Sequence, residues 1–311
     1  MNHFIDIKDI SKKNLKLIIK DAKKRKIKRK KFNNVDLDRD APLKGKLLIM
    51  MFEKPSTRTR MSFYLAMRQC GGNTHTIRAE ELHLGIKGGE SIHDTAKILS
   101  NYGDIFMLRS GSHNKILEFK KYLKIPIICG LSPKTHATQI LSDVFTIEEI
   151  KGPISKLNIS WIGDSNNVLN SLIEASVKFS FQLNIACPKK YQPTKKILNW
   201  AKKNESKIHL YHDAKKAAYK ADVVITDKWI SMGDKVNKLK KIKDFKNFQI
   251  NSKLMKHAKK DAIFLHCLPA SRGQEVSAEV IDGKQSKVWQ QALNRVHLQK
   301  SILIYTIGKL R

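Results

Sequence analysis

The sequence predicts an α/β fold with two doubly wound parallel-sheet domains. Short apolar runs alternate with helical patterns along most of the chain, which is typical of parallel sheets with helices on both faces. The chain has 311 residues, enough for two domains with separate cores. The breaker pair Gly152-Pro153 interrupts the pattern near the middle. We therefore expect one domain over residues 1–150 and another over residues 151–284.

In the first half, the run 47–52 is too short and too apolar for an amphipathic helix, so we expect a buried strand there. Ser11 and Ser91 can each cap a helix. The other elements follow from the same alternation of patterns. The strands are expected at 73–77, 105–108 and 125–129, and the helices from Ser11 through Ala22, from Ser56 or Thr57 to Gly71-Gly72, from Ser91 through Leu99, over 116–123, and from His136 through Ile147.

The second half repeats the alternation of strands and helices. The strands are expected at 157–162, 183–186, 208–211, 223–226 and 262–265, and the helices from the turn 163–167 to Phe179, over 194–203, over 214–221 and over 285–307. In sheets of this kind, ligands gather at the carboxyl ends of the strands. Side chains that directly follow a strand are therefore the first candidates for a functional site.

The chain is strongly basic, with 60 Lys and Arg against 28 Asp and Glu and a net charge of +32. Such a balance suits a nucleic-acid-binding protein, and the densest basic run covers residues 23–31. However, no aromatic residue that could stack on bases lies between Phe4 and Phe32. We interpret the excess as a lysine-rich surface that can steer anionic substrates, and keep nucleic-acid binding as an alternative.

Several classes of protein are not favoured by the sequence. No apolar run approaches the length of a membrane span, and residues 1–6 lack the apolar stretch of a signal peptide. A single glycine in the turn at Gly163 is far from a dinucleotide-binding motif, so no nicotinamide cofactor is expected. The cysteines lie far apart without metal-type spacing, which predicts reduced thiols in a cytoplasm and no metal site. They are Cys70, Cys129, Cys187 and Cys267.

The stretch 54–60 connects a strand to the start of a helix, and it is rich in hydrogen-bond donors. Ser56, Thr57 and Thr59 offer hydroxyls, Arg58 and Arg60 offer guanidinium groups, and the helix start offers free N–H groups. These are the features of a phosphate site. An ordinary cap with solvated arginines is the simpler alternative, but the density of donors favours the anion site.

The run Ser56-Thr57-Arg58-Thr59-Arg60 resembles the phosphate-binding signature of the aspartate and ornithine carbamoyltransferase family. The resemblance implies that these residues bind carbamoyl phosphate. Arg109 directly follows a strand and is well placed to reach the same anion. The stretch His136-Ala137-Thr138-Gln139 is similar to the family's His-Pro-x-Gln motif, with His136 on the carbamoyl oxygen and Gln139 on the carbamoyl nitrogen; Ala137 replaces the proline and its fixed φ.

The second half carries three further motifs. A carboxylate followed by a hydroxyl suits an amino-acid zwitterion, and residues 227–233 resemble the ornithine loop of the ornithine branch, with Asp227, Ser231 and Met232 as ligands. Asn167 corresponds to the substrate-binding asparagine of the Gly-Asp-x-Asn-Asn turn. The run His266-Cys267-Leu268-Pro269 resembles the family's His-Cys-Leu-Pro motif. This implies that Cys267 and Leu268 belong to the carbamoyl-phosphate site, with Cys267 beside the δ-amino group of the substrate as a soft polar contact rather than a nucleophile.

The resemblance extends to the end of the chain. It implies that Arg295 is the last ligand of carbamoyl phosphate and that the helix 285–311 crosses back to complete the first domain. The implied reaction transfers a carbamoyl group to L-ornithine, in arginine biosynthesis, without a cofactor. Arg58, Arg109, His136, Cys267 and Arg295 would be catalytic, and the assembly a homotrimer or a multiple of it. The loop 81–89 lacks the glutamine of the ornithine branch, and putrescine stays open as an alternative amine.

Overall fold

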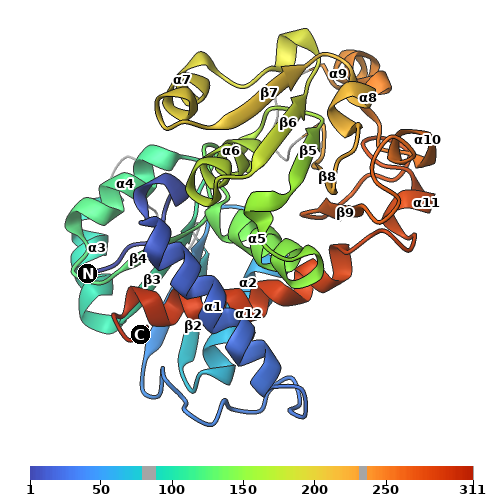
Figure 1. Ribbon diagram of the computed structural model, residues 1–311. Coiled ribbons are helices and arrows are strands. Elements are labelled where there is room, and N and C mark those ends of the chain that lie inside the picture. The colour runs from blue at the N-terminus through green and yellow to red at the C-terminus, as the bar shows by residue number, and fades with distance from the viewer. Residues whose placement is uncertain (79–88, 231–236, 311) are drawn as a thin grey trace. The chain divides into compact units, whose positions relative to one another are not determined.

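The computed structural model describes residues 1–78, 89–230 and 237–310. The chain divides into two compact units. Unit 1 comprises Met1–Phe145 together with Leu293–Arg311, and unit 2 comprises Thr146–Ala292. Each unit contains its own parallel β-sheet with helices between the strands (Figure 1). The predicted fold class, two α/β units with parallel sheets, is confirmed.

Within its described residues, unit 1 has four parallel strands in the order β2-β1-β3-β4. The chain places β2 on one side of β1 and β3 on the other, so the direction of winding reverses between β1 and β3. Ligands in such sheets bind at the carboxyl ends of the strands beside this switch point. The elements are η1 (Ile7–Asp9), α1 (Lys12–Lys28), β1 (Leu47–Phe52), α2 (Thr57–Gln69), β2 (Asn73–Arg78), α3 (Ile92–Tyr102), β3 (Ile105–Arg109), α4 (His113–Tyr122), β4 (Ile127–Leu131), α5 (Ala137–Lys151) and α12 (Val288–Thr306).

The central strands of unit 1 are buried along nearly their whole length. Ile49 and Met51 of β1 pack with Phe106 and Leu108 of β3 and with Phe119 of α4 in one core cluster. The rings of Phe106 and Phe119 lie 5.2 Å apart between centroids. A parallel sheet covered on both faces needs such continuous apolar strands. The core therefore holds the carboxyl ends of β1 and β3 in a fixed register.

Most helix starts in unit 1 agree with the sequence prediction. Ser11 accepts a hydrogen bond from the Asn14 amide at 3.1 Å, and Ser91 caps α3 in the same way. Several boundaries differ by one to three residues, for example the end of β4 at Leu131 rather than 129, the end of the later helix α8 (Ala214–Ala218) at Ala218 rather than 221 and the start of α12 at Val288 rather than 285. Two of the differences in unit 1 have a clear cause. Helix α4 begins before residue 116, because Ser112 caps it through the amide of Lys115. Strand β4 begins at Ile127 rather than at residue 125, since Pro126 has no N–H for the ladder.

The C-terminal helix α12 packs within unit 1, as the predicted return of the chain requires. Lys300 is fully buried, and its ammonium donates to both carboxylate oxygens of Asp38 at 2.9 and 3.1 Å. Ser301 donates to Asp21, and Asn14 donates to the hydroxyl of Tyr305. Helices α1 and α12 therefore lie side by side (Figure 1). Removal of one partner of a buried ion pair leaves a buried charge uncompensated, so loss of Asp38 or Lys300 alone would destabilise this contact between α12 and the rest of unit 1.

His297, on α12, makes the stability of the protein depend on pH. Burial, followed by the charges of Lys300 and Lys26, lowers the pKa of His297 to about 3. The unfolded chain therefore binds more protons than the folded protein below about pH 6.5, so the free energy of unfolding falls as the pH falls. From pH 7 to pH 5 we expect this histidine to account for a loss of about 2 kcal/mol. Urea unfolding of His297→Gln at both pH values should show a smaller loss by that amount, and an unchanged pH dependence would contradict the assignment.

In the part of unit 2 that the structure describes, five parallel strands lie in the order β7-β6-β5-β8-β9, and the winding reverses between β5 and β8. Ile162, Val224 and Phe264 of three strands share its core with Ala217 and Ala218 of α8. The elements are η3 (Ile154–Lys156), β5 (Asn158–Ile162), α6 (Asn167–Phe179), β6 (Gln182–Ala186), η4 (Lys189–Tyr191), α7 (Lys195–Lys203), β7 (Lys207–Tyr211), α8 (Ala214–Ala218), β8 (Val223–Thr226), α9 (Lys238–Phe245), η5 (Lys246–Phe248), α10 (Ser252–Met255), β9 (Ile263–His266) and α11 (Ala278–Ile281).

Three α-helices among the described residues of unit 2 were not predicted from the sequence, and neither were its short 3-10 helices. Helix α9 is dominated by lysine and has few apolar positions, while α10 and α11 have only four residues each, too few for a periodic pattern to emerge. They form because Phe245, Leu254 and Val280 are buried in the core of the unit. Among the described residues, we find no helix with the length and apolar character needed to cross a bilayer.

Candidate functional site

The turn between β1 and α2 offers hydrogen-bond donors that the protein does not use for capping. Ser56 is the N-cap residue of α2, but its side chain makes no capping hydrogen bond. Thr57 is exposed, Arg58 is half-buried and Arg60 is exposed. No carboxylate within the described residues pairs with Arg58. The first-turn N–H groups of a helix have no partner within the helix and favour negative charge, so this turn can hold an anion.

Arg295 and Thr59 join the two chain segments of unit 1 at this turn. The guanidinium Nη2 of Arg295 donates to Oγ1 of Thr59 at 3.0 Å, and both residues are buried. They lie 236 positions apart in the sequence. Helix α12 thus places a cation beside the first turn of α2. The structure brings together these two predicted ligands.

His136 lies at the start of α5 and is 5% exposed. Burial, followed by the positive charges of Arg295, Arg109 and Arg58, lowers the pKa of His136 well below 6.5. The imidazole is therefore neutral at neutral pH and keeps one N–H to donate. The effect of the three arginines on this pKa indicates that their charges lie near His136. Four of the predicted catalytic residues therefore gather in unit 1.

Gln139 is fully buried, one helical turn after His136. Its amide nitrogen donates to Oδ1 of Asp143 at 3.1 Å, which fixes the orientation of the side chain. Within the described part of the chain, its Oε1 has no hydrogen-bond partner. A buried acceptor without a partner costs about 1–3 kcal/mol, so such an atom suits a ligand that brings an N–H group. The predicted contact with a carbamoyl nitrogen has this chemistry.

Arg109 is the last residue of β3, and it pairs with Phe52 in the register of β1 and β3. It is 8% exposed. The turn after β1 and the side chain of Arg109 therefore stand at the carboxyl ends of adjacent strands, beside the switch point of the sheet. This position was predicted from Arg109 following a strand, but the adjacency of the two strands comes from the structure.

In unit 2, Asp227 lies at the carboxyl end of β8, beside the switch point with β5. Its Oδ2 accepts a hydrogen bond from Nδ2 of Asn166 at 2.7 Å, and its Oδ1 accepts one from the thiol of Cys267 at 3.0 Å. The thiol proton points to a carboxylate, which suits a soft polar contact better than a nucleophilic thiolate. The structure therefore brings Asp227 and Cys267 together.

Asn166 is a functional candidate that the sequence analysis missed in favour of its neighbour Asn167. Its Oδ1 accepts from the amides of Val168 and Leu169 and caps α6, while its Nδ2 holds Asp227. Asn167 is the first residue of the helix and is half-buried. The preference of asparagine for N-cap positions could have identified Asn166.

The remaining predicted ligands are Leu268, in unit 2, and two residues of the loop 227–233. Leu268 has a φ of 55°, and its amide donates to Nδ1 of His266 at 2.8 Å. Cys267 and Leu268 belong to unit 2, whereas the other predicted ligands of carbamoyl phosphate belong to unit 1. Ser231, Met232 and nearly all of the loop 81–89 lie outside the described residues.

Asp227, His266 and Cys267 form the described group that is able to hold a metal ion, with ligand atoms within 4.8 Å of one another. Their present contacts oppose that role. Nδ1 of His266 already accepts from the amide of Leu268, and its Nε2 lies 3.4 Å from Oε1 of Glu275. The Cys267 thiol lies 3.0 Å from Oδ1 of Asp227, as a hydrogen-bond donor. A metal would have to displace these contacts, and the absence of a metal site stays a prediction.

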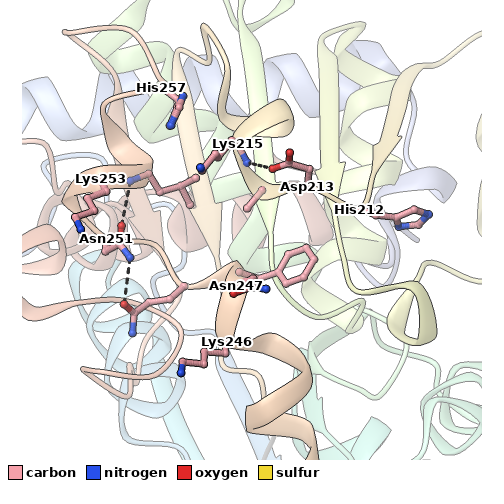
Figure 2. Close-up of a pocket in the computed structure, with 12 residues that line it drawn as sticks. His212, Asp213, Lys215, Lys246, Asn247, Asn251, Lys253 and His257 are labelled. Atoms are coloured by element: carbon pink, nitrogen blue, oxygen red, sulfur yellow. Dashed lines mark hydrogen bonds between the residues drawn. The ribbon is translucent and has the colours of Figure 1, made fainter.

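Unit 2 also contains a basic cleft of about 660 Å³ (Figure 2). Lys215, Lys246 and Lys253 line it together with His212 and His257. Asp213, also on its wall, accepts a hydrogen bond from the backbone amide of Lys215, as Figure 2 shows. Among the residues that the structure describes, none of those predicted to bind substrate lines this cleft. The switch-point residues, rather than this cleft, are therefore the candidate site of unit 2.

Comparisons with known proteins cover nearly the whole chain. Residues 2–149 match the family described as "Aspartate/ornithine carbamoyltransferase, carbamoyl-P binding domain", and residues 155–306 match its "Asp/Orn binding domain". The ornithine carbamoyltransferase of Rhizobium meliloti is 46% identical over 306 residues, 98% of each chain.

Two solved structures extend the likeness to the fold. The ornithine carbamoyltransferase of Pyrococcus furiosus has a TM-score of 0.93 at 40% identity and covers 100% of this chain and 98% of that one. The anabolic ornithine carbamoyltransferase of Campylobacter jejuni has a TM-score of 0.90 at 38% identity, with 99% and 100% covered. With two matched domains in this order, the chain belongs to the aspartate/ornithine carbamoyltransferase family.

Proposed function

We propose that the protein is an ornithine carbamoyltransferase. It transfers the carbamoyl group of carbamoyl phosphate to the δ-amino group of L-ornithine, with L-citrulline and phosphate as products. The observation that carries the proposal is the neutral, buried His136 among Arg58, Arg109 and Arg295 at a strand switch point. This arrangement suits a ligand that has both a phosphate and a polar carbonyl group.

The first domain, residues 1–150 completed by the helix 285–311, binds carbamoyl phosphate in this proposal. Ser56, Thr57, Arg58, Thr59 and Arg60 hold the phosphate through hydroxyl, amide and guanidinium donors. The carbonyl oxygen receives hydrogen bonds from groups that include Arg109, His136 and Arg295. Gln139 is the proposed ligand of the carbamoyl nitrogen. Its Oε1, which has no hydrogen-bond partner among the described residues, can accept a hydrogen bond from that nitrogen.

The second domain, residues 151–284, binds ornithine. Asp227 supplies the negative charge that an α-amino group needs, and Asn166 holds that carboxylate in place. Asn167, Ser231 and Met232 complete the amino-acid site in the proposal. Cys267 and Leu268 contact the reacting groups in the proposal, and the Cys267 thiol is a polar contact beside the δ-amino group.

Catalysis in this proposal depends on position and on electrostatics. Carbamoyl phosphate carries its own leaving group, so the reaction needs no covalent intermediate with the enzyme. Holding two reactants in a near-attack geometry can contribute ~7–11 kcal/mol. The attacking amine has an unperturbed pKa of about 10.4, like that of lysine, and must lose a proton first. Each donor to the developing oxyanion contributes about 10²–10³-fold in rate.

A citrulline assay with purified protein tests the proposal. We expect carbamoyl phosphate with L-ornithine to give citrulline, and the same reaction with putrescine or aspartate to give little carbamoylated product. A faster reaction with putrescine would show that the substrate is this amine rather than ornithine. Steeply salt-dependent DNA or RNA binding that survives Arg58→Gly, without citrulline formation, would instead favour a nucleic-acid-binding protein.

The biological setting belongs to the same proposal. The likeness to a structure described as anabolic supports a role in arginine biosynthesis. Four free cysteines support a cytoplasmic location. A homotrimer is in keeping with the large apolar side chains that stay exposed on α2 and α3, namely Met61, Tyr64, Ile98 and Tyr102. Sedimentation equilibrium of the purified protein measures the number of subunits.

A further inference from the structure

Glu53 connects the two strand ends that carry the anion site of unit 1. It directly follows β1 and precedes the turn with Arg58. Its Oε2 accepts from the hydroxyl of Ser110 at 2.6 Å and from the amide of Gly111 at 2.8 Å. Its own amide donates to the carbonyl oxygen of Arg109 at 3.0 Å. A single residue therefore binds the end of β1 to the segment that begins at Arg109.

A carboxylate next to a phosphate site would ordinarily weaken anion binding. Here Oε1 of Glu53 accepts from the ammonium of Lys115 at 2.5 Å, so the negative charge is paired. Burial raises the pKa of Glu53, but the hydrogen bonds from Lys115, Ser110 and Gly111 hold it below its ordinary value. The Glu53 carboxylate is thus paired with Lys115, and its other oxygen accepts hydrogen bonds from the residues that follow β3.

Ser110, the residue to which Glu53 is hydrogen-bonded, is itself held in place by neighbouring elements. Ser110 is 2% exposed, and its amide donates to the carbonyl oxygen of Leu131 on β4 at 3.0 Å. Its hydroxyl also accepts from the amide of Ser112, the residue that caps α4. The turn after β1 is therefore connected through Glu53 to the ends of β3 and β4 and to the start of α4.

We propose that Glu53 is a positioning residue, which holds the β1–α2 turn and Arg109 in the single arrangement that binds the phosphate of carbamoyl phosphate. This inference rests on the proposed function. Misplacement of binding groups by about 1 Å can lower the rate about 10²-fold, so loss of the Glu53 contacts is expected to have a large effect.

The effect of Glu53→Ala has opposite signs under the two possible roles. If Glu53 acts only through its charge, removal of a negative charge tightens anion binding. If it positions the site, the Michaelis constant for carbamoyl phosphate rises about tenfold or more, while the constant for ornithine changes less than twofold. Glu53→Gln keeps an acceptor for Ser110 and Gly111, so it should recover most of the loss.

The experiment measures inorganic phosphate binding by calorimetry together with both Michaelis constants and thermal unfolding. Weaker phosphate binding in Glu53→Ala, with recovery in Glu53→Gln, supports the proposal. Unchanged or tighter binding overturns it, as does a loss of thermal stability alone. If Glu53→Ala does not fold, Ser110→Ala removes one of the contacts and should weaken phosphate binding about threefold; no weakening overturns the proposal.

Calorimetry separates this inference from the proposed function, because phosphate binding requires no turnover. If the wild-type protein forms no citrulline but Glu53→Ala still binds phosphate more weakly, the proposed reaction is wrong and the positioning role stands. If the wild-type protein forms citrulline and Glu53→Ala binds phosphate as well as it does, the positioning role is wrong. If the wild-type protein neither forms citrulline nor binds phosphate, both are wrong; if it forms citrulline but binds no phosphate, the positioning role alone is wrong.

Discussion

Arg58→Gly is expected to lower kcat/KM for carbamoyl phosphate by about 10³-fold or more. Arg58 is half-buried in the first turn of α2 and has no carboxylate partner within the described residues, so its charge is available to the phosphate. Its charge also helps to lower the pKa of the buried His136, after burial and the charges of Arg295 and Arg109. The loss combines a guanidinium–phosphate hydrogen bond with the stabilisation of the leaving group. Steady-state citrulline formation at varied carbamoyl phosphate measures the effect.

Arg68→Gly is the matched control for this variant. Arg68 is exposed in the last turn of the same helix, so the substitution removes the same charge and introduces the same residue. A glycine in a helix costs about 1 kcal/mol of stability relative to alanine, a cost that both variants share. We expect Arg68→Gly to retain nearly full activity. Wild-type citrulline formation by Arg58→Gly would refute the assignment of the anion site.

Asp227→Asn is expected to lower kcat/KM for ornithine by about 10²-fold. The amide keeps the shape of the side chain but removes the negative charge proposed for the α-amino group. Hydrogen bonds to charged groups contribute about 1.5–3 kcal/mol, and each 1.36 kcal/mol corresponds to a tenfold change. Both carboxylate oxygens accept hydrogen bonds, from Asn166 and from Cys267, so the new NH₂ group also opposes one of these donors.

Two measurements make the Asp227 prediction specific. Phosphate binding by calorimetry should stay unchanged, because the proposed carbamoyl phosphate ligands at the anion site lie in the other unit. The control Asp261→Asn removes an exposed carboxylate of the same unit that pairs with Lys151, and it should leave both Michaelis constants unchanged. An Asp227→Asn enzyme with the wild-type constant for ornithine would show that the amino-acid site lies elsewhere.

The sequence could predict those site residues that lie in short, continuous motifs. The run 56–60 has its donors on adjacent residues, and Arg109 directly follows the apolar run 105–108. Asn166 and Glu53 were missed as functional candidates, because their roles depend on partners that are distant in sequence. The carboxylate of Glu53 reaches Ser110 and Lys115, which lie 57 and 62 positions away.

The sequence by itself determined the α/β class, most of the strands and the residues that follow them, since apolar periodicity, caps and breakers act over a few residues. Only the tertiary structure decided that β1 adjoins β3 and that β5 adjoins β8. The pairing of Arg295 with Thr59 and of Cys267 with Asp227 was decided at the same level. Strand order and helix docking depend on which apolar faces cover one another across the whole chain, and no local pattern carries that information.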